Sequence, residues 1–420
     1  MEYKISDLCD IRRGASPRPI KKYIVEDYDN SFPWVKIADA TKDLSRYISN
    51  TKERVSLEGS KKSVEVLPGD LILSNSATPG LPKFMKVKAY IHDGWLLLRN
   101  FKNVRKEYLY YVLIFNRQKL LQLSNGSVFN NLKTDIVKNY VVDIPSIEIQ
   151  DKILKIINNI ENKLDANKKI IANLEELSQT LFKRWFVDFE FPDEDGNPYK
   201  SSGGEMNDSE LGKIPSNWKI YQLKDIASHK KETFNPKKSE EVTVKHFSLP
   251  AYDNEEQAID EAVNKIKSNK WIINNNCILF SKMNPDTKRI WLPVIDNKKL
   301  NVASSEFVVM ESPNNKINSF VYNICLNSQF IDYLKANTTG STNSRQRVKP
   351  TIAVNYKLAI EDSIVKKYSE IITPYMEEMK ILRSEIGKLT QLRDTLLPKL
   401  MAGEIEIPDD IEVNMDELSI

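Results

Sequence analysis

Residues 3–11 read YKISDLCDI and residues 218–226 read WKIYQLKDI, so the chain presents one short pattern twice, 215 positions apart. Lysine, isoleucine, leucine, aspartate and a final isoleucine recur at matching places. Two further pairs of segments follow in the same order: KNYVVDI (138–144) with VNYKLAI (354–360), and GDLILSNS (69–76) with NCILFSKM (276–283). Such self-similarity indicates an internal duplication, in which both halves follow one structural plan.

Each half is expected to begin with a mixed α+β domain. Short runs rich in β-branched and aromatic residues, such as PWVKIAD and DLILSNS, are separated by Pro, Gly and Asn, which is typical of strands joined by turns. Residues 107–123 and 318–334 have instead the apolar spacing of helices, at corresponding places in the two halves. The predicted fold class is therefore α+β.

After each domain the sequence predicts a long amphipathic helix. Apolar residues recur every three or four positions over many turns, which is the spacing of a coiled-coil seam. The first seam comprises Ile153, Ile157, Ile160, Leu164, Ile171, Leu174 and Leu181, and the second comprises Tyr368, Ile372, Tyr375, Met379, Leu382, Ile386, Leu389 and Leu396. We expect the helices to pair as an antiparallel coiled coil that separates and joins the two domains with pseudo-two-fold symmetry. The alternative is two surface helices, each packed on its own domain.

These segments divide the chain into six predicted parts: a first domain (1–150), a helical spacer (151–186), an acidic linker (187–216), a second domain (217–362), a second spacer (363–401) and an acidic tail (402–420). Pro374 predicts a kink in the second helix, or a restart with Thr373 as its cap, because proline lacks the amide that a helix needs. Pro398 and Gly403 predict the end of that helix.

Charge is unevenly distributed along the chain. The formal net charge is only +3, but residues 187–210 carry −7 and residues 402–420 carry −7, which leaves +17 on the remainder. A basic body with acidic connectors is typical of a protein that binds a polyanion. The alternative is a general compositional bias toward lysine, asparagine and isoleucine.

The composition favours a soluble, cytoplasmic protein with reduced thiols. The longest apolar runs, LIL and WLLL, are far shorter than the roughly 18 residues of a membrane span. The first ten residues are acidic rather than basic, unlike a secretory peptide. Cys9, Cys277 and Cys325 stand singly without a CxxC pair, so neither disulfides nor a zinc site is indicated.

Four segments together resemble the specificity subunit of type I restriction-modification systems: LCDIRRGASPRPI (8–20), LFKRWFVDFEFP (181–192), SELGKIPSNW (209–218) and LPKLMAGEI (397–405). The resemblance extends over nearly the whole chain. It implies that each domain is a target recognition domain for one half of a split sequence in double-stranded DNA. It also implies that the helices set the gap and dock two methyltransferase subunits, and that restriction subunits with translocase and endonuclease activity join the complex. S-adenosylmethionine, ATP and Mg would then be used by those partners, with no cofactor and no metal in this chain.

The candidate DNA-binding residues lie in polar, basic loops. In the first domain they are Arg12, Arg13, Arg18, Lys21, Lys22, Asn130, Asn131 and Lys133. In the second they are Lys230, Lys231, Lys282, Lys288, Arg289, Asn343, Arg345, Gln346, Arg347 and Lys349. Arginine and lysine suit phosphates, and amide side chains suit adenine edges. The alternative for each residue is a solvated turn.

Catalytic motifs are missing from the sequence. There is no N/D-PP-Y/F methylase motif and no GxxxxGK[ST] phosphate loop, and the three histidines have neither metal-ligand spacing nor triad partners. PGD (68–70) and NPD (284–286) resemble parts of a nuclease carboxylate site, but fragments this short occur by chance in any charged chain. We therefore expect a non-catalytic DNA-recognition subunit. A coiled-coil scaffold without DNA, or a stand-alone methylase or nuclease, are the alternatives.

Overall fold

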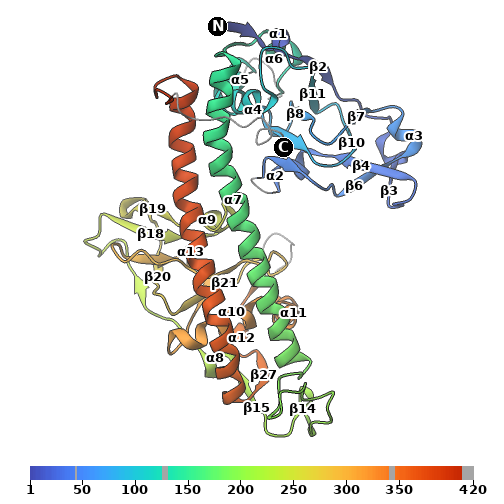
Figure 1. Cartoon of the computed structure of the whole chain (residues 1–420). Helices are drawn as coiled ribbons and strands as arrows, with labels where there is room; N and C mark the ends of the chain where they lie inside the picture. The colour runs from blue at the N-terminus through green and yellow to red at the C-terminus, as the bar shows by residue number, and fades with distance from the viewer. Residues whose placement is uncertain (43–44, 125–130, 340–345, 409–420) are drawn as a thin grey trace. The chain divides into compact units, whose positions relative to one another are not determined.

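The computed structural model describes residues 1–42, 45–124, 131–339 and 346–408. The chain forms two compact units: unit 1 comprises Met1–Lys163 and Thr390–Ile420, and unit 2 comprises Leu164–Leu389. Each unit contains one domain of β-sheets and short helices together with a segment of each long helix, α7 (Ile147–Phe182) and α13 (Asp362–Met401) (Figure 1). The α+β fold class is confirmed.

Domain 1, residues 2–143 of unit 1, has two five-stranded sheets within its described residues. One sheet has the strand order β2-β11-β8-β9-β5, and the other has the order β3-β6-β4-β10-β7, in which β4 and β10 are parallel. The elements are β1 (Glu2–Lys4), α1 (Ile5–Leu8), β2 (Asp10–Arg13), η1 (Ile20–Lys22), β3 (Ile24–Val25), β4 (Ser31–Val35), α2 (Ile37–Thr41), β5 (Tyr47–Ile48), β6 (Glu53–Ser56), α3 (Leu57–Ser60), β7 (Val64–Val66), β8 (Leu71–Ser74), β9 (Pro82–Met85), β10 (Ala89–Ile91), β11 (Trp95–Arg99), α4 (Lys106–Phe115), α5 (Arg117–Ser124), α6 (Thr134–Asn139) and β12 (Val141–Asp143).

Domain 2, residues 219–360 of unit 2, repeats this plan. Its described strands form the sheets β16-β24-β21-β22 and β17-β20-β23-β18-β19, and β18 and β23 are parallel. The elements of unit 2 between the long helices are η2 (Lys183–Val187), β13 (Met206–Ser209), β14 (Gly212–Pro215), β15 (Lys219–Gln222), α8 (Leu223–Ile226), β16 (Ser228–His229), β17 (Thr233–Phe234), β18 (Thr243–Phe247), α9 (Leu249–Asp253), β19 (Ile259–Ala262), η3 (Val263–Lys265), β20 (Lys270–Ile272), β21 (Cys277–Ser281), β22 (Ile290–Trp291), β23 (Asn301–Ala303), β24 (Phe307–Glu311), α10 (Asn315–Leu326), α11 (Ser328–Ala336), β25 (Thr338–Thr339), β26 (Arg347–Val348), α12 (Pro350–Ala353) and β27 (Lys357–Ile360).

The two domains differ at their sheet edges. Among the described strands, β5 extends the first sheet of domain 1 to five strands where the matching sheet of domain 2 has four, and the second sheet differs as well. In domain 1 the short strand β3 pairs with β6, next to β4, whereas in domain 2 the short strand β17 pairs with β20, next to β23. Since β4 corresponds to β18 and β10 to β23, the fifth strand has been added on opposite edges of an otherwise equivalent sheet. The duplication has therefore kept the core and changed its edge.

The structure also corrects the register of the repeat. Ile5, which begins α1, corresponds to Leu223, which begins α8, so the offset is 218 residues rather than 215. In both places an aspartate accepts a backbone hydrogen bond at the start of the helical turn: Asp7 from the Lys4 amide at 3.1 Å and Asp225 from the Gln222 amide at 2.8 Å. The capping aspartates and the buried apolar residues define the structural repeat. The alignment of identical residues at an offset of 215 is displaced from it by three positions.

The central sheet of each domain is buried on both faces, as its continuous apolar strands require. Along β8, Leu71 and Leu73 join the core that contains α4, and Ile72 joins the core on the opposite face. Along β21, Ile278 and Phe280 likewise face the core that contains α10, and Leu279 faces the other. This alternation with a period of two explains why both stretches gave the same pattern in the sequence.

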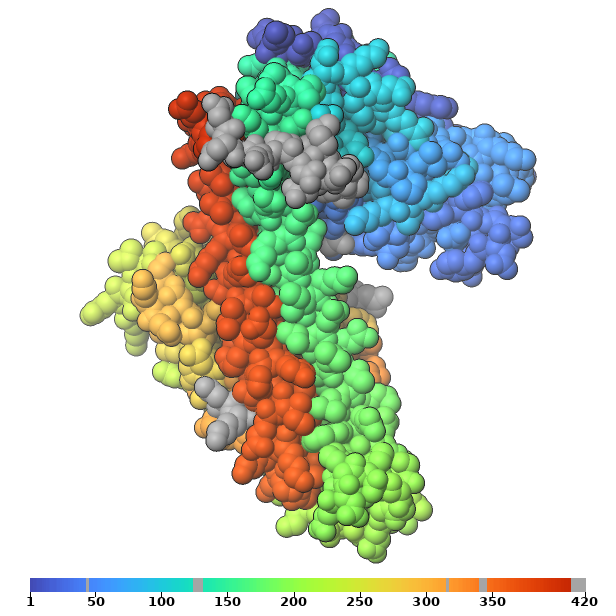
Figure 2. All heavy atoms as spheres, viewed as in Figure 1, coloured from blue at the N-terminus to red at the C-terminus, as the bar shows by residue number. Residues whose placement is uncertain are grey.

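The helices α7 and α13 run antiparallel within each unit. In unit 2, Asn167 donates to Glu385 at 2.8 Å and the Tyr368 hydroxyl donates to the Ser178 carbonyl at 3.0 Å, so residue numbers fall on one helix as they rise on the other. In unit 1, Arg393 contacts Glu161 at 3.4 Å in the same sense. Figure 2 shows the two helices in side-by-side contact.

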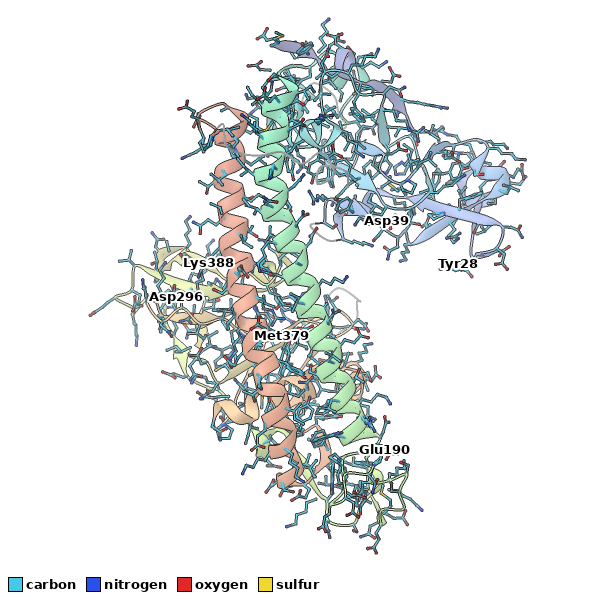
Figure 3. The ribbon with its side chains drawn as sticks, in the orientation of Figure 1. Tyr28, Asp39, Glu190, Asp296, Met379 and Lys388 are labelled. Atoms are coloured by element: carbon cyan, nitrogen blue, oxygen red, sulfur yellow. The ribbon has the colours of Figure 1, made fainter. Side chains whose placement is uncertain are left out.

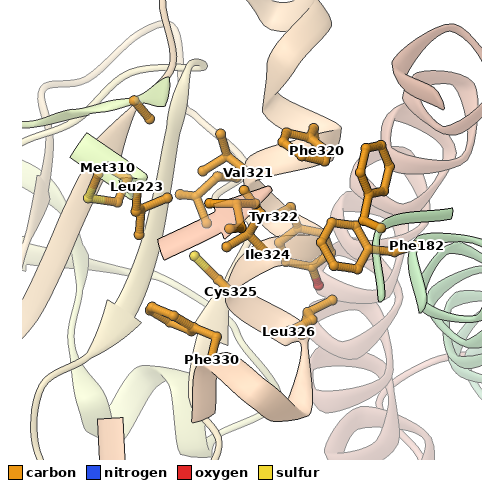
Figure 4. Close-up of a cluster of buried hydrophobic side chains, with 14 of the residues drawn as sticks. Phe182, Leu223, Met310, Phe320, Val321, Tyr322, Ile324, Cys325, Leu326 and Phe330 are labelled. Carbon is orange, nitrogen blue, oxygen red and sulfur yellow. The ribbon is translucent and has the colours of Figure 1, made fainter. Parts of the chain in front are cut away.

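Every predicted seam residue is at least partly buried, and both helices also pack on the domain cores. Ile153 and Ile157 lie in the core of domain 1 with Leu397 of α13. In unit 2, Phe182 of α7 packs against Phe320 of α10, as Figure 4 shows. The fully buried seam residues are Ile153, Ile157, Ile160, Leu164, Tyr368, Ile372, Met379, Leu382 and Ile386, and the partly buried ones are Ile171, Leu174, Leu181, Tyr375, Leu389 and Leu396.

Helix α13 does not restart at Pro374, so the restart with Thr373 as its cap, one of the two predicted outcomes, is wrong. It is continuous from Asp362 to Met401, and Thr373 is helical, with its hydroxyl 3.1 Å from that of Ser319. Pro374 and Glu370, whose carbonyl loses a partner, are both exposed, so water can satisfy the free carbonyl. The helix ends at Met401, and Gly403, whose φ of +69° suits glycine, follows its end. Pro398 lies inside the last turn, so the predicted stop is confirmed for Gly403 and not for Pro398.

The acidic segment after α7 is anchored by aromatic side chains. Phe186, in the π-helical turn η2, lies 5.7 Å from Trp218 between ring centroids, and Phe191 lies 5.0 Å from the same ring. These side chains explain the aromatic character of LFKRWFVDFEFP. No helix in the described ranges is both long and apolar enough to span a bilayer.

Candidate nucleic-acid interface

Three of the predicted residues of domain 1, Arg13, Asn131 and Lys133, line one cavity of about 420 Å³. We call it cleft 1. Its other lining residues come from the turn after β8, from the turn between β10 and β11, and from the start of α6: Asn75, Ser76, His92, Asp93, Gly94, Leu132 and Thr134. Cleft 1 thus combines two cationic side chains, two amides and a carboxylate, which are groups that contact phosphates and base edges.

The turn at residues 92–94 is held from three directions. The backbone carbonyl of Asp93 accepts hydrogen bonds from Arg13 Nε at 3.0 Å and from Asn75 Nδ2 at 3.1 Å. The Ser16 hydroxyl donates to Asp93 Oδ1 at 2.6 Å, and this bond is the main reason that the pKa of Asp93 lies below its usual value. Asp93 is therefore ionised at neutral pH, and its position is preorganised.

A larger, mainly apolar cavity of about 890 Å³ adjoins cleft 1 and shares His92 and Asp93 with it. We call it pocket A, and its walls include Trp34, Ile37 and the predicted residue Arg18. Lys36 also lines it. Asp39, labelled in Figure 3, accepts from the Lys36 amide at 2.8 Å and the Lys52 amide at 3.1 Å, which fixes the start of α2 at this wall.

Domain 2 builds a loop junction equivalent to cleft 1. In domain 1 the Leu132 amide donates to the Asn75 carbonyl at 2.8 Å, and the Asn75 amide donates to the Gly94 carbonyl at 2.8 Å. In domain 2 the Val348 amide donates to the Lys282 carbonyl at 2.9 Å, and the Lys282 amide donates to the Glu306 carbonyl at 3.0 Å. Because both bonds are reproduced, the two loops occupy the same place in the two domains.

The side chains at these equivalent places differ. Lys282 occupies the position of Asn75, Glu306 that of Gly94 and Arg347 that of Asn131. Arg347 pairs with Glu306 at 3.2 Å. Lys133 and Lys349 correspond as the residues that precede α6 and α12. One scaffold therefore presents two chemically different surfaces.

Most of the predicted cations carry no ion pair within the described ranges of the chain, which leaves them available to phosphates. This holds for Arg12, Arg18, Lys21, Lys22, Lys133, Lys231, Lys282, Lys288 and Lys349. Arg12 follows the strand alternation and so lies on the opposite face of β2 from Arg13. Lys21 and Lys22 are exposed in the turn η1.

Three predicted residues of domain 2 lie away from the loop junction. Lys230 is largely buried and pairs with Glu311 at 3.0 Å. Arg289 makes two bonds with Asp253, at 2.7 and 2.9 Å. Lys288 lines a separate cavity of about 670 Å³ beside α7. Gln346 is described at the junction, where its carbonyl accepts from the Asn284 amide at 2.9 Å, whereas Asn130, Asn343 and Arg345 lie outside the described residues.

Sequence reasoning missed Asn75, His92 and Asp93. The available signal was the repeat itself, because GDLILSNS and NCILFSKM end at Ser76 and Met283, directly after the strand that forms each junction. His92 and Asp93 were not detectable in this way, since domain 2 has serines there. Among the described residues no group of three or more His, Cys, Asp or Glu side chains is arranged to hold a metal.

Comparison with known proteins gives the same picture as the sequence resemblance. Residues 1–176 match the family model described as the type I restriction modification DNA specificity domain. The chain is 26% identical over 419 residues to the type I restriction enzyme MjaIX specificity subunit of Methanocaldococcus jannaschii, covering 97% of this chain and 93% of that protein. It is 29% identical over 202 residues to the HindI specificity subunit of Haemophilus influenzae, covering 45% of this chain and 42% of that protein. The suspected resemblance to type I specificity subunits is confirmed.

A solved structure shares the fold. The crystal structure of the type I restriction-modification system S subunit from M. genitalium aligns with a TM-score of 0.53 at 13% identity, covering 97% of this chain and 96% of that chain. At this identity the likeness concerns the fold alone, in which two domains are joined by helices.

Proposed function

We propose that this chain is the non-catalytic DNA-recognition subunit of a type I restriction-modification complex, in which domain 1 and domain 2 each read one half of a bipartite, asymmetric target. The observation that carries the proposal is the pair of equivalent loop junctions with different side chains. Two domains with identical contact residues would favour a symmetric target. Here the contact positions differ, because domain 1 has Asn75, Gly94 and Asn131 where domain 2 has Lys282, Glu306 and Arg347. Base-contacting side chains determine sequence preference, so the two halves of the target should differ.

Helices α7 and α13 set the spacing between the half-sites and dock two methyltransferase subunits. Support comes from their length and from the antiparallel contacts found in both units. Restriction subunits join the same assembly. Catalysis belongs to these partners, which bring S-adenosylmethionine, ATP and Mg, while this chain supplies the binding surface.

The decisive experiment is to map methylated adenines across a host genome that carries the complex with and without this chain. A single split motif that depends on the chain supports the proposal. Exchange of residues 1–146 with those of a related chain of known target should change one half of the motif only. If both halves change, or if neither does, the division of labour between the domains is refuted.

The spacer role has its own test. Inserting seven residues after Lys163 and seven after Leu389 keeps the seam in phase and lengthens each helix by about 10.5 Å, or roughly three base pairs of DNA. The gap in the mapped motif should grow by about that number. An unchanged gap would argue against a helical ruler while leaving DNA recognition intact.

The alternatives make opposite predictions in solution. A scaffold that does not bind DNA would show no salt-dependent affinity for duplex DNA. A subunit that neutralises several phosphates instead loses affinity for DNA steeply as the salt concentration rises. A stand-alone methylase or nuclease would turn over in the purified chain supplied with plasmid, magnesium and S-adenosylmethionine. Turnover without partners would overturn the proposal.

A further inference from the structure

His92 and Asp93 line both cleft 1 and pocket A. The His92 ring also carries a hydrogen-bond donor whose position is fixed. Its Nδ1 accepts the Gly94 amide at 2.8 Å, so in the neutral ring the proton resides on Nε2. Within the described residues Nε2 has no hydrogen-bond partner, and it is absent from the buried polar atoms that lack one, so it is open to solvent. The imidazole is thus held as a donor that faces outward.

The ring is kept neutral by its surroundings. Burial lowers the pKa of His92, the Lys36 charge lowers it further, and the nearby carboxylates of Asp93 and Asp39 only partly oppose this. Protonation would also place a hydrogen on Nδ1 and break the bond from Gly94. At neutral pH the side chain therefore offers one N–H and no acceptor.

Gly94 is needed for this geometry. A Cβ at residue 94 would lie 2.2 Å from the His92 ring and 2.5 Å from the Ser76 hydroxyl, so only glycine lets the imidazole fold back over the backbone amide. The Trp34 ring lies 6.1 Å from the imidazole on the pocket A side. The turn is also anchored by Arg13, Asn75 and Ser16 through Asp93.

Cationic side chains flank His92 on both sides. Arg13 and Lys133 line cleft 1, and Arg18 and Lys36 line pocket A. Arg18 and Lys133 have no ion pair among the described residues, whereas Arg13 lies 3.8 Å from Asp93 and Lys36 pairs with Glu53. Cations at the margins suit phosphate positions, which leaves the position between them for a base edge. In domain 2 the corresponding turn has Ser304 and Ser305 before Glu306, so this device belongs to domain 1 alone.

We propose that His92 reads one base of the half-site bound by domain 1, donating from Nε2 to a major-groove acceptor. Purine N7, guanine O6 and thymine O4 can accept this bond, whereas cytosine presents only its amino donor there. His92 therefore discriminates against cytosine at that position, and Gly94 is the residue that positions it. This inference rests on the proposed function of the chain.

The test uses the purified complex of this chain with its methyltransferase partners and a library of randomised duplexes, sequenced after binding. For the native complex we expect a bipartite motif in which cytosine is excluded at one position. For His92→Ala we expect that exclusion to weaken about three- to tenfold, the worth of one neutral hydrogen bond, at that position only. His92→Gln, whose amide nitrogen can take the place of Nε2, should keep most of the preference.

Two further variants separate positioning from folding. Gly94→Ala should displace the ring and reproduce the His92→Ala profile while the melting temperature stays within the range of a surface variant. Ser304→Ala, at the matching turn of domain 2, should leave the first half-site unchanged. Thermal unfolding of every variant is measured alongside.

The outcomes are distinguishable. A native complex without a bipartite preference overturns the proposed function. A native bipartite motif that His92→Ala leaves intact overturns the role of His92 and spares the proposed function. A uniform loss of affinity at all positions would make His92 a general anchor and would also overturn the inference.

Discussion

Arg383 of α13 is the centre of a buried polar network in unit 2, and its removal should strongly destabilise that unit. Its side chain is 7% exposed, and it contacts Glu175 of α7 at 2.7 Å and Glu256, which follows α9, at 3.1 Å. The Tyr322 hydroxyl of α10 donates to the same Glu175 oxygen at 2.6 Å. One guanidinium thus joins both long helices to domain 2.

The expected magnitude follows from burial. Arg383→Ala leaves two carboxylates without their counter-charge, and breaking a buried pair in this way costs about 3–5 kcal/mol. For a unit the size of residues 164–389, each kcal/mol lowers the melting temperature by about 2–4 °C, so a drop of about 6–20 °C is expected. Burial already raises the pKa of Glu256, and loss of Arg383 raises it further.

The pH dependence has a definite sign. A carboxyl whose pKa is raised by folding binds its proton more tightly in the folded state than in the unfolded one. The free energy of unfolding therefore decreases as the pH rises through the folded pKa and the carboxyl ionises. The deficit of Arg383→Ala should therefore be largest at neutral pH and should shrink as the pH falls and the carboxyls become protonated. Adding Glu256→Gln to Arg383→Ala should recover part of the loss at neutral pH.

Unfolding is followed by calorimetry and by tryptophan fluorescence, since Trp185, Trp218, Trp271 and Trp291 all lie in unit 2. Arg289→Ala is the matched control, because Arg289 makes a similar two-bond pair with the half-exposed Asp253, for which a loss of about 1 kcal/mol or less is expected. Equal melting temperatures for Arg383→Ala and the native chain would refute the reasoning. So would a double variant that is less stable than Arg383→Ala at neutral pH.

Three other predictions concern separate parts of the molecule. Lys21→Ala, in the exposed turn η1, should weaken DNA binding about equally for all sequences and reduce the slope of log affinity against log salt by about 1, as measured by titration at several salt concentrations. Gly14→Ala should destabilise unit 1 by about 1–3 kcal/mol in urea unfolding, because its Cβ would lie 2.1 Å from the His92 carbonyl oxygen. Burial raises the pKa of Cys9 to about 12 and that of Cys277 to about 11, and raises that of Cys325, so a thiol reagent at pH 8 should label the native chain far more slowly than the denatured one.

Periodic burial explains what the sequence could predict. Strands buried on both faces appear in the sequence as continuous apolar runs, and the long helices appear as apolar residues spaced three or four positions apart. Both patterns are visible because each extends over only a few consecutive residues. The internal duplication was visible for the same reason. Its register was not, since it is set by the Asp7 and Asp225 caps and by pairing of β1 with β12 and of β15 with β27 across more than a hundred residues.

The candidate interface depends on long-range contacts, which limits what local patterns reveal. Arg13 and Lys133 were identifiable as basic loop residues, but the turn at Asp93 is fixed by Arg13 and Ser16, about 80 positions earlier in the chain. Arg289 was identifiable by charge as well, yet Asp253 occupies its guanidinium. The residue types therefore indicated that the surface is basic. Only the fold showed which basic residues lie together in cleft 1 and which, like Arg289, already pair with a carboxylate of the same chain.

The polar residues within the seam show how a repeating pattern can still define one register. Asn167 and Arg393 interrupt the apolar positions, and each bonds to the other long helix, to Glu385 and Glu161 respectively. Ser178 interrupts them as well: its hydroxyl donates to Asn323 of α10, and its backbone carbonyl accepts from the Tyr368 hydroxyl. Asn167 and Ser178 are fully buried. Sliding one helix along the other by a heptad would keep apolar contacts but bury these polar groups without partners, at a cost of about 1–3 kcal/mol for each group. Their positions thus favour a single alignment of α7 and α13, which a helix pair that determines a spacing requires.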